Sequence, residues 1–198
     1  MKEIVSENFT DARLPQGWSA TTPAGDNYAF GRGALEVKGH ATLSIPLGDG
    51  AWHSLRVEMA VEFDPGAQIR CSDADFRGIT LNLAGTPYPR HQVSKQQHLL
   101  GESTACIPEK TGRRSIVFEF EQGRLRALVD GAEAVSAADP FPKPLSGWIL
   151  LDMWAIGQIH SVCITGDDPC RGLLDDVPPR RQDDFSLEVN VDFFDDLI

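Results

Sequence analysis

Two tryptophans, Trp148 and Trp154, flank the carboxylate of Asp152 in the sequence WILLDMW. Successive side chains of a β-strand point to opposite faces, so these three residues share one face if the stretch is a strand. Indole rings pack on the apolar C–H surface of a sugar, and a carboxylate accepts hydrogen bonds from sugar hydroxyls. The stretch therefore predicts a carbohydrate-binding surface. The core is expected on the opposite face, which carries Ile149, Leu151 and Met153.

The same rule adds other side chains to this surface. A stretch that begins at Trp52 places this indole on one face with Arg56 and Glu58. A later stretch places Asn82 opposite its apolar neighbours. If these strands are adjacent, aromatic and polar groups line one groove. The alternative is that loops or an adjoining domain cover the large aromatic side chains, which then have no ligand role.

The residue pattern offers one candidate metal site. Asp73 and Asp75 lie two residues apart in CSDAD and could offer oxygen ligands to calcium. No other cofactor is expected. The cysteines show no C-x-x-C pair and no histidine at zinc-site spacing, so buried thiols are favoured, although three disulfide pairings remain open. They are Cys71, Cys106, Cys163 and Cys170.

The sequence contains no convincing pair of catalytic carboxylates. A glycosidase needs two carboxyl groups about 5 to 9.5 Å apart. Glu58 and Glu62 share a strand face but are about 13 Å apart at about 3.3 Å per residue. Glu119 and Glu121 have a better spacing of about 6.6 Å, but they flank a tight turn, which favours a solvated hairpin end.

A lyase site is the other catalytic alternative. Arg90 and Lys95 could neutralise a uronate while His91 or His98 abstracts a proton, because all four lie in one polar segment. The competing interpretation is a hydrated loop with assorted polar residues. No H-E-x-x-H array, G-x-S-x-G elbow, phosphate-binding loop or G-x-G-x-x-G motif occurs in the sequence.

The elements that must position these residues are β-strands. In residues 55–63 large apolar side chains alternate with polar ones and one alanine, and Gln122-Gly123 and Asp130-Gly131 suit tight hairpin turns. Residues 85–112 predict a long irregular loop, either functional or mobile. The pattern indicates an all-β fold, a two-sheet antiparallel jelly-roll sandwich. Further strands are expected at Ala34–Val37, Ala41–Leu47, Arg77–Leu83, Ser115–Phe120, Arg124–Val129, Ala132–Ser136, Trp148–Trp154 and Gln158–Thr165.

Charge separates the chain of 198 residues into two parts. Residues 167–198 contain ten acidic residues and three arginines, whereas residues 1–166 are nearly balanced. We expect a sandwich domain over 1–166, followed by an acidic linker and a terminal strand. That strand either starts a further domain of a longer chain or pairs back onto the sandwich or onto another copy. The net charge of −11 argues against a nucleic-acid partner, and neither a membrane span nor a signal peptide is expected within these residues.

The order of several features resembles the concanavalin A-like lectin/glucanase superfamily, which includes laminin-G-like modules. The features are ENF (7–9), LPQGW (14–18), GALEV (33–37), the hairpin 124–131 with its VDG turn, and GWILLDMW (147–154). The resemblance covers residues 1–166 and implies a jelly roll with one convex and one concave sheet, the concave face often binding carbohydrate. The glutamate-x-aspartate-x-x-glutamate strand of some of its hydrolases is absent from the sequence.

The sequence therefore favours a carbohydrate-binding or accessory module, non-catalytic, in a larger carbohydrate-active protein. One alternative is a glycoside hydrolase or polysaccharide lyase. The other is a structural domain that docks onto a missing C-terminal portion, which makes a C-terminal domain of the same parent chain a further expected partner.

Overall fold

The structure is a computed structural model. It describes residues 1–25, 27–63, 67–73, 78–85, 89–108, 110, 112–121 and 123–167, without the side chains of Asp73 and Ile156. The expected linker and terminal strand beyond Asp167 lie outside the described residues, as do Arg77 and Cys170. The described residues form no helix, and therefore no helix that could span a membrane.

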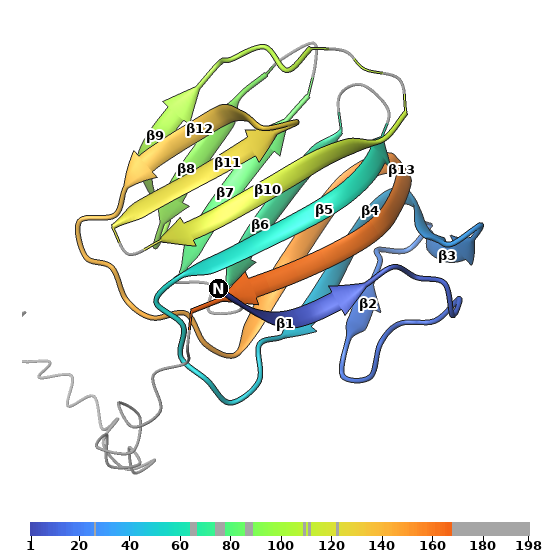
Figure 1. The fold of residues 1–198 in the computed structure, drawn as a ribbon. Helices are drawn as coiled ribbons and strands as arrows, with labels where there is room; N and C mark the ends of the chain where they lie inside the picture. Colours follow the sequence, from blue (N-terminus) through green and yellow to red (C-terminus); the bar gives the residue numbers. More distant parts are fainter. Residues whose placement is uncertain are drawn as a thin grey trace, which may run out of the picture.

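Antiparallel strands make up the described chain, which confirms the all-β prediction (Figure 1). They are β1 (Lys2–Glu7), β2 (Ser19–Thr21), β3 (Asn27–Gly31), β4 (Ala34–Pro46), β5 (Leu55–Phe63), β6 (Gln68–Asp73), β7 (Ile79–Ala84), β8 (His91–Lys95), β9 (His98–Ser103), β10 (Arg114–Glu121), β11 (Arg124–Val129), β12 (Ala132–Ala138) and β13 (Trp148–Gly166).

The strands form two stacked layers of a nearly barrel-shaped sheet. The front layer has the order β12-β11-β10-β5 and continues into the second half of β13, which also pairs with β1. The back layer has the order β9-β8-β7-β6 and continues into the first half of β13, then β4 and β2. Figure 1 shows β10, β11 and β12 in front of β7, β8 and β9, and β12 contacts both β8 and β9.

The two layers are hydrogen-bonded to each other through β13 and β4, which run from one layer into the other. The sequence predicts two separate strands in each of these places, but the structure has one continuous strand. Glycines lie at the bend: Gly39 has a φ of 94°, and Gly157 packs against the backbone of β5. A chain can bend without ending a strand where a residue has no Cβ, so the glycines do not mark strand ends here.

A β-bulge at His160 changes which side chains of β13 face the core. Ile159 pairs with Val61 and Ser161 pairs with Ala60, so His160 has no partner in the register with β5. Before the bulge the odd-numbered residues are buried, and after it the even-numbered ones are, starting with Val162. A bulge shifts the alternation by one residue, and both halves of β13 therefore keep an apolar face toward the core.

The apolar core lies between the layers and follows the predicted alternation. Ile149, Leu151 and Met153 are fully buried, which confirms the predicted core face of this stretch. In β5 the buried side chains are those of Leu55, Val57, Met59 and Val61, whereas Phe63 is only partly buried. Burying such side chains stabilises the fold by roughly 1.5–3 kcal/mol each relative to exposure.

The prediction of one long irregular loop over residues 85–112 is wrong, because the segment contains the hairpin β8–β9. Its turn residues Gln96 and Gln97 both have positive φ, as a two-residue hairpin turn requires. His91 faces the core and is fully buried. Its Nδ1 accepts a hydrogen bond from the Ala84 N–H, and its Nε2–H donates to the Ala105 carbonyl. These bonds allow a polar residue to occupy a core position. The strand is therefore difficult to recognise in the sequence, because a histidine stands where an apolar residue is expected.

Candidate functional site

Polar side chains cross the outer face of the back layer in two parallel rows. We call the first the polar row, with one residue from each of seven strands. Its members are Thr21, Thr42, Asp152, Arg70, Asn82, Gln92 and Glu102, each paired in register with the next. Strands are about 4.8 Å apart, so the row is about 29 Å long.

The second row, which we call the hydroxyl row, lies two residues from the first on each strand, or three on β9, where a register shift occurs. Its members are Ser19, Ser44, Leu150, Ser72, Thr80, Ser94 and Leu99. Five of these seven side chains are small and carry a hydroxyl group, which is both donor and acceptor. Small side chains beside the longer ones of the polar row leave the hydroxyl groups open to a ligand that lies across the strands.

Asp152 is the centre of a hydrogen-bond network in the polar row. One carboxylate oxygen, Oδ1, accepts from His40 Nε2 at 2.6 Å and from the Thr42 hydroxyl at 2.9 Å, and Oδ2 accepts from Arg70 Nη2 at 2.5 Å. Its side chain is 18% exposed. Both oxygens are therefore engaged by the protein, so Asp152 orients its neighbours more than it offers an acceptor to a sugar.

Trp154 lies between two charged or polar side chains from the strands on either side of β13. The His40 ring from β4 is stacked on the indole with a centroid distance of 4.4 Å and an interplanar angle of 6°. The guanidinium carbon of Arg70 from β6 lies 4.1 Å from the ring centroid. Because β4 and β6 flank β13, the two groups cover the two faces of the indole. Trp154 shares the predicted face with Asp152, but it has no face left for stacking on a sugar.

The far end of the polar row carries a second network. Glu102 Oε2 accepts hydrogen bonds from Gln92 Nε2 at 2.8 Å and from Arg90 Nε at 2.9 Å. The bonds from Gln92 and Arg90 hold the pKa of the Glu102 carboxyl below its usual value. The neighbouring Asn82 Oδ1 accepts from Gln68 Nε2 at 2.7 Å, which leaves the amide N–H groups of Asn82 as donors.

Trp148 is an open aromatic group of this face. Its side chain is 41% exposed, and it lies at the first residue of β13, two residues from Leu150 of the hydroxyl row. The face therefore presents one accessible indole beside the two rows, whereas the alternation of Trp148, Asp152 and Trp154 predicts two beside a carboxylate.

The structure separates the other predicted site residues from this face. Trp52 is 6% exposed and lies in the core, because it precedes β5 and forms an isolated bridge with Leu145, so the alternation of β5 does not extend to it. Arg56 and Glu58 lie on the outer face of the front layer. Strand β5 is adjacent to the second half of β13 and not to the first half, which carries Trp148 and Asp152.

The expectation of a solvated hairpin end at Glu119 is wrong. Its side chain is only 6% exposed and forms ion pairs with Arg56 from β5 and Arg126 from β11. The hydrogen bond to Glu119 also raises the pKa of Arg126. Sequence reasoning missed this because both arginines approach from neighbouring strands at the same register position.

The residues of the lyase alternative do not converge. His91 is buried between the layers and bonded to backbone groups, whereas Arg90 is 65% exposed and paired with Glu102. Lys95 points inward to Asp139, and His98 is exposed on β9. These four side chains therefore do not surround a common point where a substrate could be bound by its carboxylate and lose a proton.

The predicted calcium ligands lie outside the described residues, since these do not include Asp75 or the side chain of Asp73. No group of three or more His, Cys, Asp or Glu residues in the described part of the chain could hold a metal ion. Of the cysteines, Cys71 is buried, whereas Cys106 is an exposed free thiol and Cys163 a half-buried one. Burial, and then the charges of Glu3 and Glu58, raise the pKa of Cys163.

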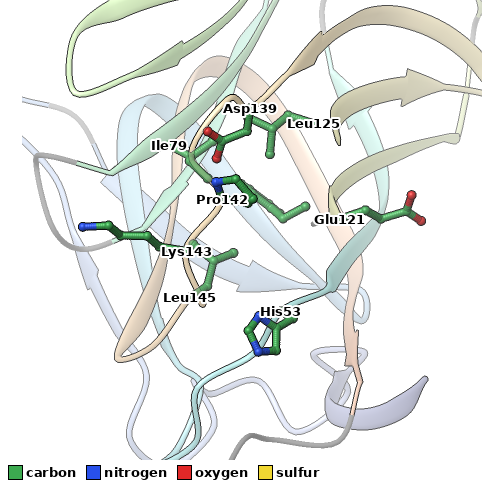
Figure 2. A pocket seen from close by; sticks show the side chains of 9 residues that line it. His53, Ile79, Glu121, Leu125, Asp139, Pro142, Lys143 and Leu145 are labelled. Atoms are coloured by element: carbon green, nitrogen blue, oxygen red, sulfur yellow. The ribbon is translucent and has the colours of Figure 1, made fainter. Parts of the chain in front are cut away.

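A small pocket at one end of the sandwich is too small for a sugar (Figure 2). Asp139, Pro142, Lys143 and Leu145 line it from the loop before β13, with His53 on the other side. Its volume is about 10 Å³, which is at most enough for one water molecule. In Figure 2 the charged end of Lys143 points away from the pocket.

Sequence reasoning missed most members of the two rows. Arg70 and Gln92 could have been found, because each lies between two buried residues in the short alternating stretches IRC (69–71) and HQV (91–93). His40 and Glu102 carry no such signal, since they lie beside a bend and on an edge strand.

Comparison with known proteins gives matches only at the level of structure. No family model matches the sequence, and no curated protein matches it significantly. A protein of unknown function with a galectin-like fold from Bacillus subtilis covers 84% of this chain and 96% of its own, with 10% identity and a TM-score of 0.62.

Two sugar-bound domains are also similar. The exoplasmic/lumenal domain of VIP36, in its Ca²⁺/Man2-bound form, covers 87% of this chain and 90% of its own, with 8% identity and a TM-score of 0.59. Domain 4 of AbnA, a GH43 extracellular arabinanase from Geobacillus stearothermophilus, was solved with arabinotriose; it covers 83% and 92%, with 15% identity and a TM-score of 0.58. Together with the layers and strand order, these matches show that this chain has the concanavalin A-like lectin/glucanase jelly-roll fold.

Proposed function

We propose that this chain is a non-catalytic carbohydrate-binding module whose ligand lies on the outer face of the back layer. The observation that carries the proposal is the pair of rows that cross seven strands beside the exposed Trp148. They offer hydrogen-bond donors and acceptors at intervals of about 4.8 Å, and a sugar chain presents hydroxyl groups all along its length. An oligosaccharide lying across the strands fits this pattern better than a single sugar.

The charges of the polar row favour an uncharged glycan. Asp152 is paired with Arg70, and Glu102 is paired with Arg90, so both carboxylates are neutralised. The chain as a whole has a formal net charge of −11, which repels polyanions such as uronate polymers. We therefore expect neutral oligosaccharides to bind and charged ones to bind more weakly.

The spacing of carboxylates on this face supports a binding role without catalysis. Asp152 and Glu102 lie four strands apart, or about 19 Å. A glycosidase pair needs about 5 to 9.5 Å. Incubating concentrated protein with the neutral polysaccharides arabinan, mannan, cellulose and xylan should therefore release no new reducing ends.

The similar structures add support for the ligand class and for an accessory role. VIP36 was solved with mannose-containing ligands, AbnA domain 4 with arabinotriose, and CBM66 from Bacillus subtilis is a carbohydrate-binding module. AbnA domain 4 belongs to an arabinanase of several domains. On this basis we propose that the chain serves as an accessory module of a larger carbohydrate-active protein.

Calcium is proposed as a structural ion at Asp73 and Asp75. The support is the pair of carboxylates in CSDAD and the Ca²⁺ bound to VIP36. Titration with Ca²⁺ after removal of metal by EDTA should raise the midpoint of thermal unfolding, because an ion that binds only the folded chain stabilises it. If Ca²⁺ raises the unfolding midpoint of the wild type but not that of Asp73→Asn, the ion binds at this segment.

Calorimetric titration with neutral oligosaccharides tests the binding proposal. Arabinotriose, mannobiose, cellotriose and xylotriose serve as probes. We expect Trp148→Ala and Gln92→Ala to weaken binding about fivefold or more, the usual effect of losing one contact. Glu58→Ala, on the outer face of the front layer, is the matched control and should leave affinity unchanged. Equal loss in all three variants, or no binding of any probe, contradicts the proposed site.

A further inference from the structure

We infer that Arg70 is the principal hydrogen-bond donor to the ligand of this face, and that Trp154 and Asp152 act as positioning residues that fix its guanidinium group. The inference rests on the proposed function and deepens it, because it identifies which side chain determines specificity. It also replaces the role predicted for Trp154, which was to stack on a sugar.

Arg70 is held at two points. Its Nη2 donates to Asp152 Oδ2 at 2.5 Å, and its guanidinium carbon lies over the Trp154 indole, 4.1 Å from the ring centroid. Asp152 and Trp154 are both fixed in turn by His40, whose Nε2–H donates to Asp152 and whose ring stacks on Trp154. The guanidinium group therefore has little freedom left.

The remaining donors of Arg70 are open to a ligand. A guanidinium group has five N–H donors. Within the described residues, Asp152 is the only hydrogen-bond acceptor for the side chain. The side chain is 36% exposed and lies in the polar row between Asp152 and Asn82. A ligand crossing the strands must pass these N–H groups.

Fixing a donor before the ligand arrives strengthens binding. An arginine that is free in solvent loses side-chain entropy when it binds, whereas a clamped planar guanidinium group loses little. The clamp also selects the ligand, since it presents only N–H donors and requires acceptor oxygens such as vicinal hydroxyl groups. Lysine cannot replace it, because an ammonium group cannot stack flat on Trp154 and still present a fork of donors.

The test is a double-mutant cycle measured by calorimetric titration with whichever of arabinotriose, mannobiose, cellotriose and xylotriose binds the wild type most tightly. We expect Arg70→Lys and Trp154→Leu each to weaken binding about tenfold, the loss typical of a hydrogen bond from a charged donor. Trp154→Phe keeps a flat aromatic face under the guanidinium group and should retain most of the affinity. Trp154→Leu should have no further effect in an Arg70→Lys background, because Trp154 acts through Arg70.

The controls separate the outcomes. Arg124→Lys, an exposed arginine on the outer face of the front layer, should leave affinity unchanged, and thermal unfolding checks that every variant is folded. If the wild type binds and Arg70→Lys binds equally well, this inference is wrong while the proposed function stands. If Trp154→Leu weakens binding further in the Arg70→Lys background, Trp154 contacts the ligand itself and the positioning role is wrong. If the wild type binds none of the probes, the proposed function and this inference are both wrong.

Discussion

Lys95 and Asp139 form an ion pair that is buried at one end of the sandwich. Lys95 Nζ lies 2.6 and 2.8 Å from the two carboxylate oxygens of Asp139, and the side chains are 16% and 2% exposed. The same ammonium group donates to the carbonyl of Phe141, and the Phe141 N–H donates to Asp139 at 3.0 Å. The pair thus ties β8 of the back layer to the loop that follows β12 of the front layer.

Lys95→Met should lower the free energy of unfolding by about 3 kcal/mol, because it leaves a buried carboxylate without its counter-charge. Urea denaturation measures the change. The control is Lys110→Met, which breaks the exposed pair with Asp130 and should cost less than about 1 kcal/mol. Equal effects of the two substitutions would show that burial does not set the strength of the pair.

Glu119→Gln should destabilise the chain by about 2 kcal/mol. It removes the charge that both Arg56 and Arg126 share, but these arginines are partly exposed, so the loss is smaller than for a fully buried pair. Glu121→Gln, two residues away at the hairpin end, should stay within about 0.5 kcal/mol. Glycan affinity should not change in either variant, since both residues lie on the front layer. A large loss of affinity in Glu119→Gln would indicate that the ligand binds the front layer, which contradicts the proposed site.

Asp130 should make stability depend on pH in the acid range. Burial would raise the pKa of this carboxyl, but the hydrogen bond from the Ser115 N–H and the charges of Lys110 and Arg114 lower it overall. A carboxyl group with a lowered pKa stabilises the folded state above its unfolded pKa of about 4, and this stabilisation is lost as the pH falls through the folded value.

Asp130→Asn is the matching variant, because asparagine also tolerates the positive φ of 49° at this turn. It should cost about 0.5–1 kcal/mol at pH 7, as for a largely solvated ion pair. The difference from the wild type should shrink as the pH falls below about 4. Unfolding by urea at a series of pH values gives the two curves, and a constant gap between them is the contrary result.

Gly157→Ala should destabilise the fold by about 2 kcal/mol or more through overpacking at the bend of β13. A Cβ there would lie 2.7 Å from the Cα of Phe63, and backbone atoms of β5 cannot move aside cheaply. Gly31→Ala is the matched control, because its Cβ would meet only the flexible carboxylate end of Glu36, at 2.6 Å. Similar unfolding midpoints for the two variants would remove the packing argument.

Cys106 should react with iodoacetamide before Cys163 does. The thiolate is the reactive form, and burial and nearby glutamates raise the pKa of Cys163, whereas Cys106 is exposed. Peptide mapping after a short reaction at pH 8 measures both sites. Faster modification of Cys163 would mean that the second half of β13 opens more easily than its burial indicates.

The sequence by itself determined the class of the fold and the faces of single strands. Period-two alternation follows from backbone geometry within one strand, so the burial of Ile149, Leu151 and Met153, and the shared face of Trp148, Asp152 and Trp154, could be read locally. The Asp130-Gly131 turn could also be predicted from the local sequence, since an Asp-Gly pair readily adopts the positive φ that such a hairpin turn needs and both residues have it.

Only the tertiary structure decided which strands are neighbours and therefore what the site contains. His40 and Arg70, which cover Trp154, are separated from Asp152 by 112 and 82 positions in the sequence. Hydrogen bonding between strands is non-local and leaves no trace in the alternation of either partner. For the same reason Arg56 and Glu58 could be assigned to a face of their own strand but not to a layer. The two halves of β13 lie in different layers because of the glycine bend and the His160 bulge. The layer of Arg56 and Glu58 follows from the half of β13 with which β5 pairs.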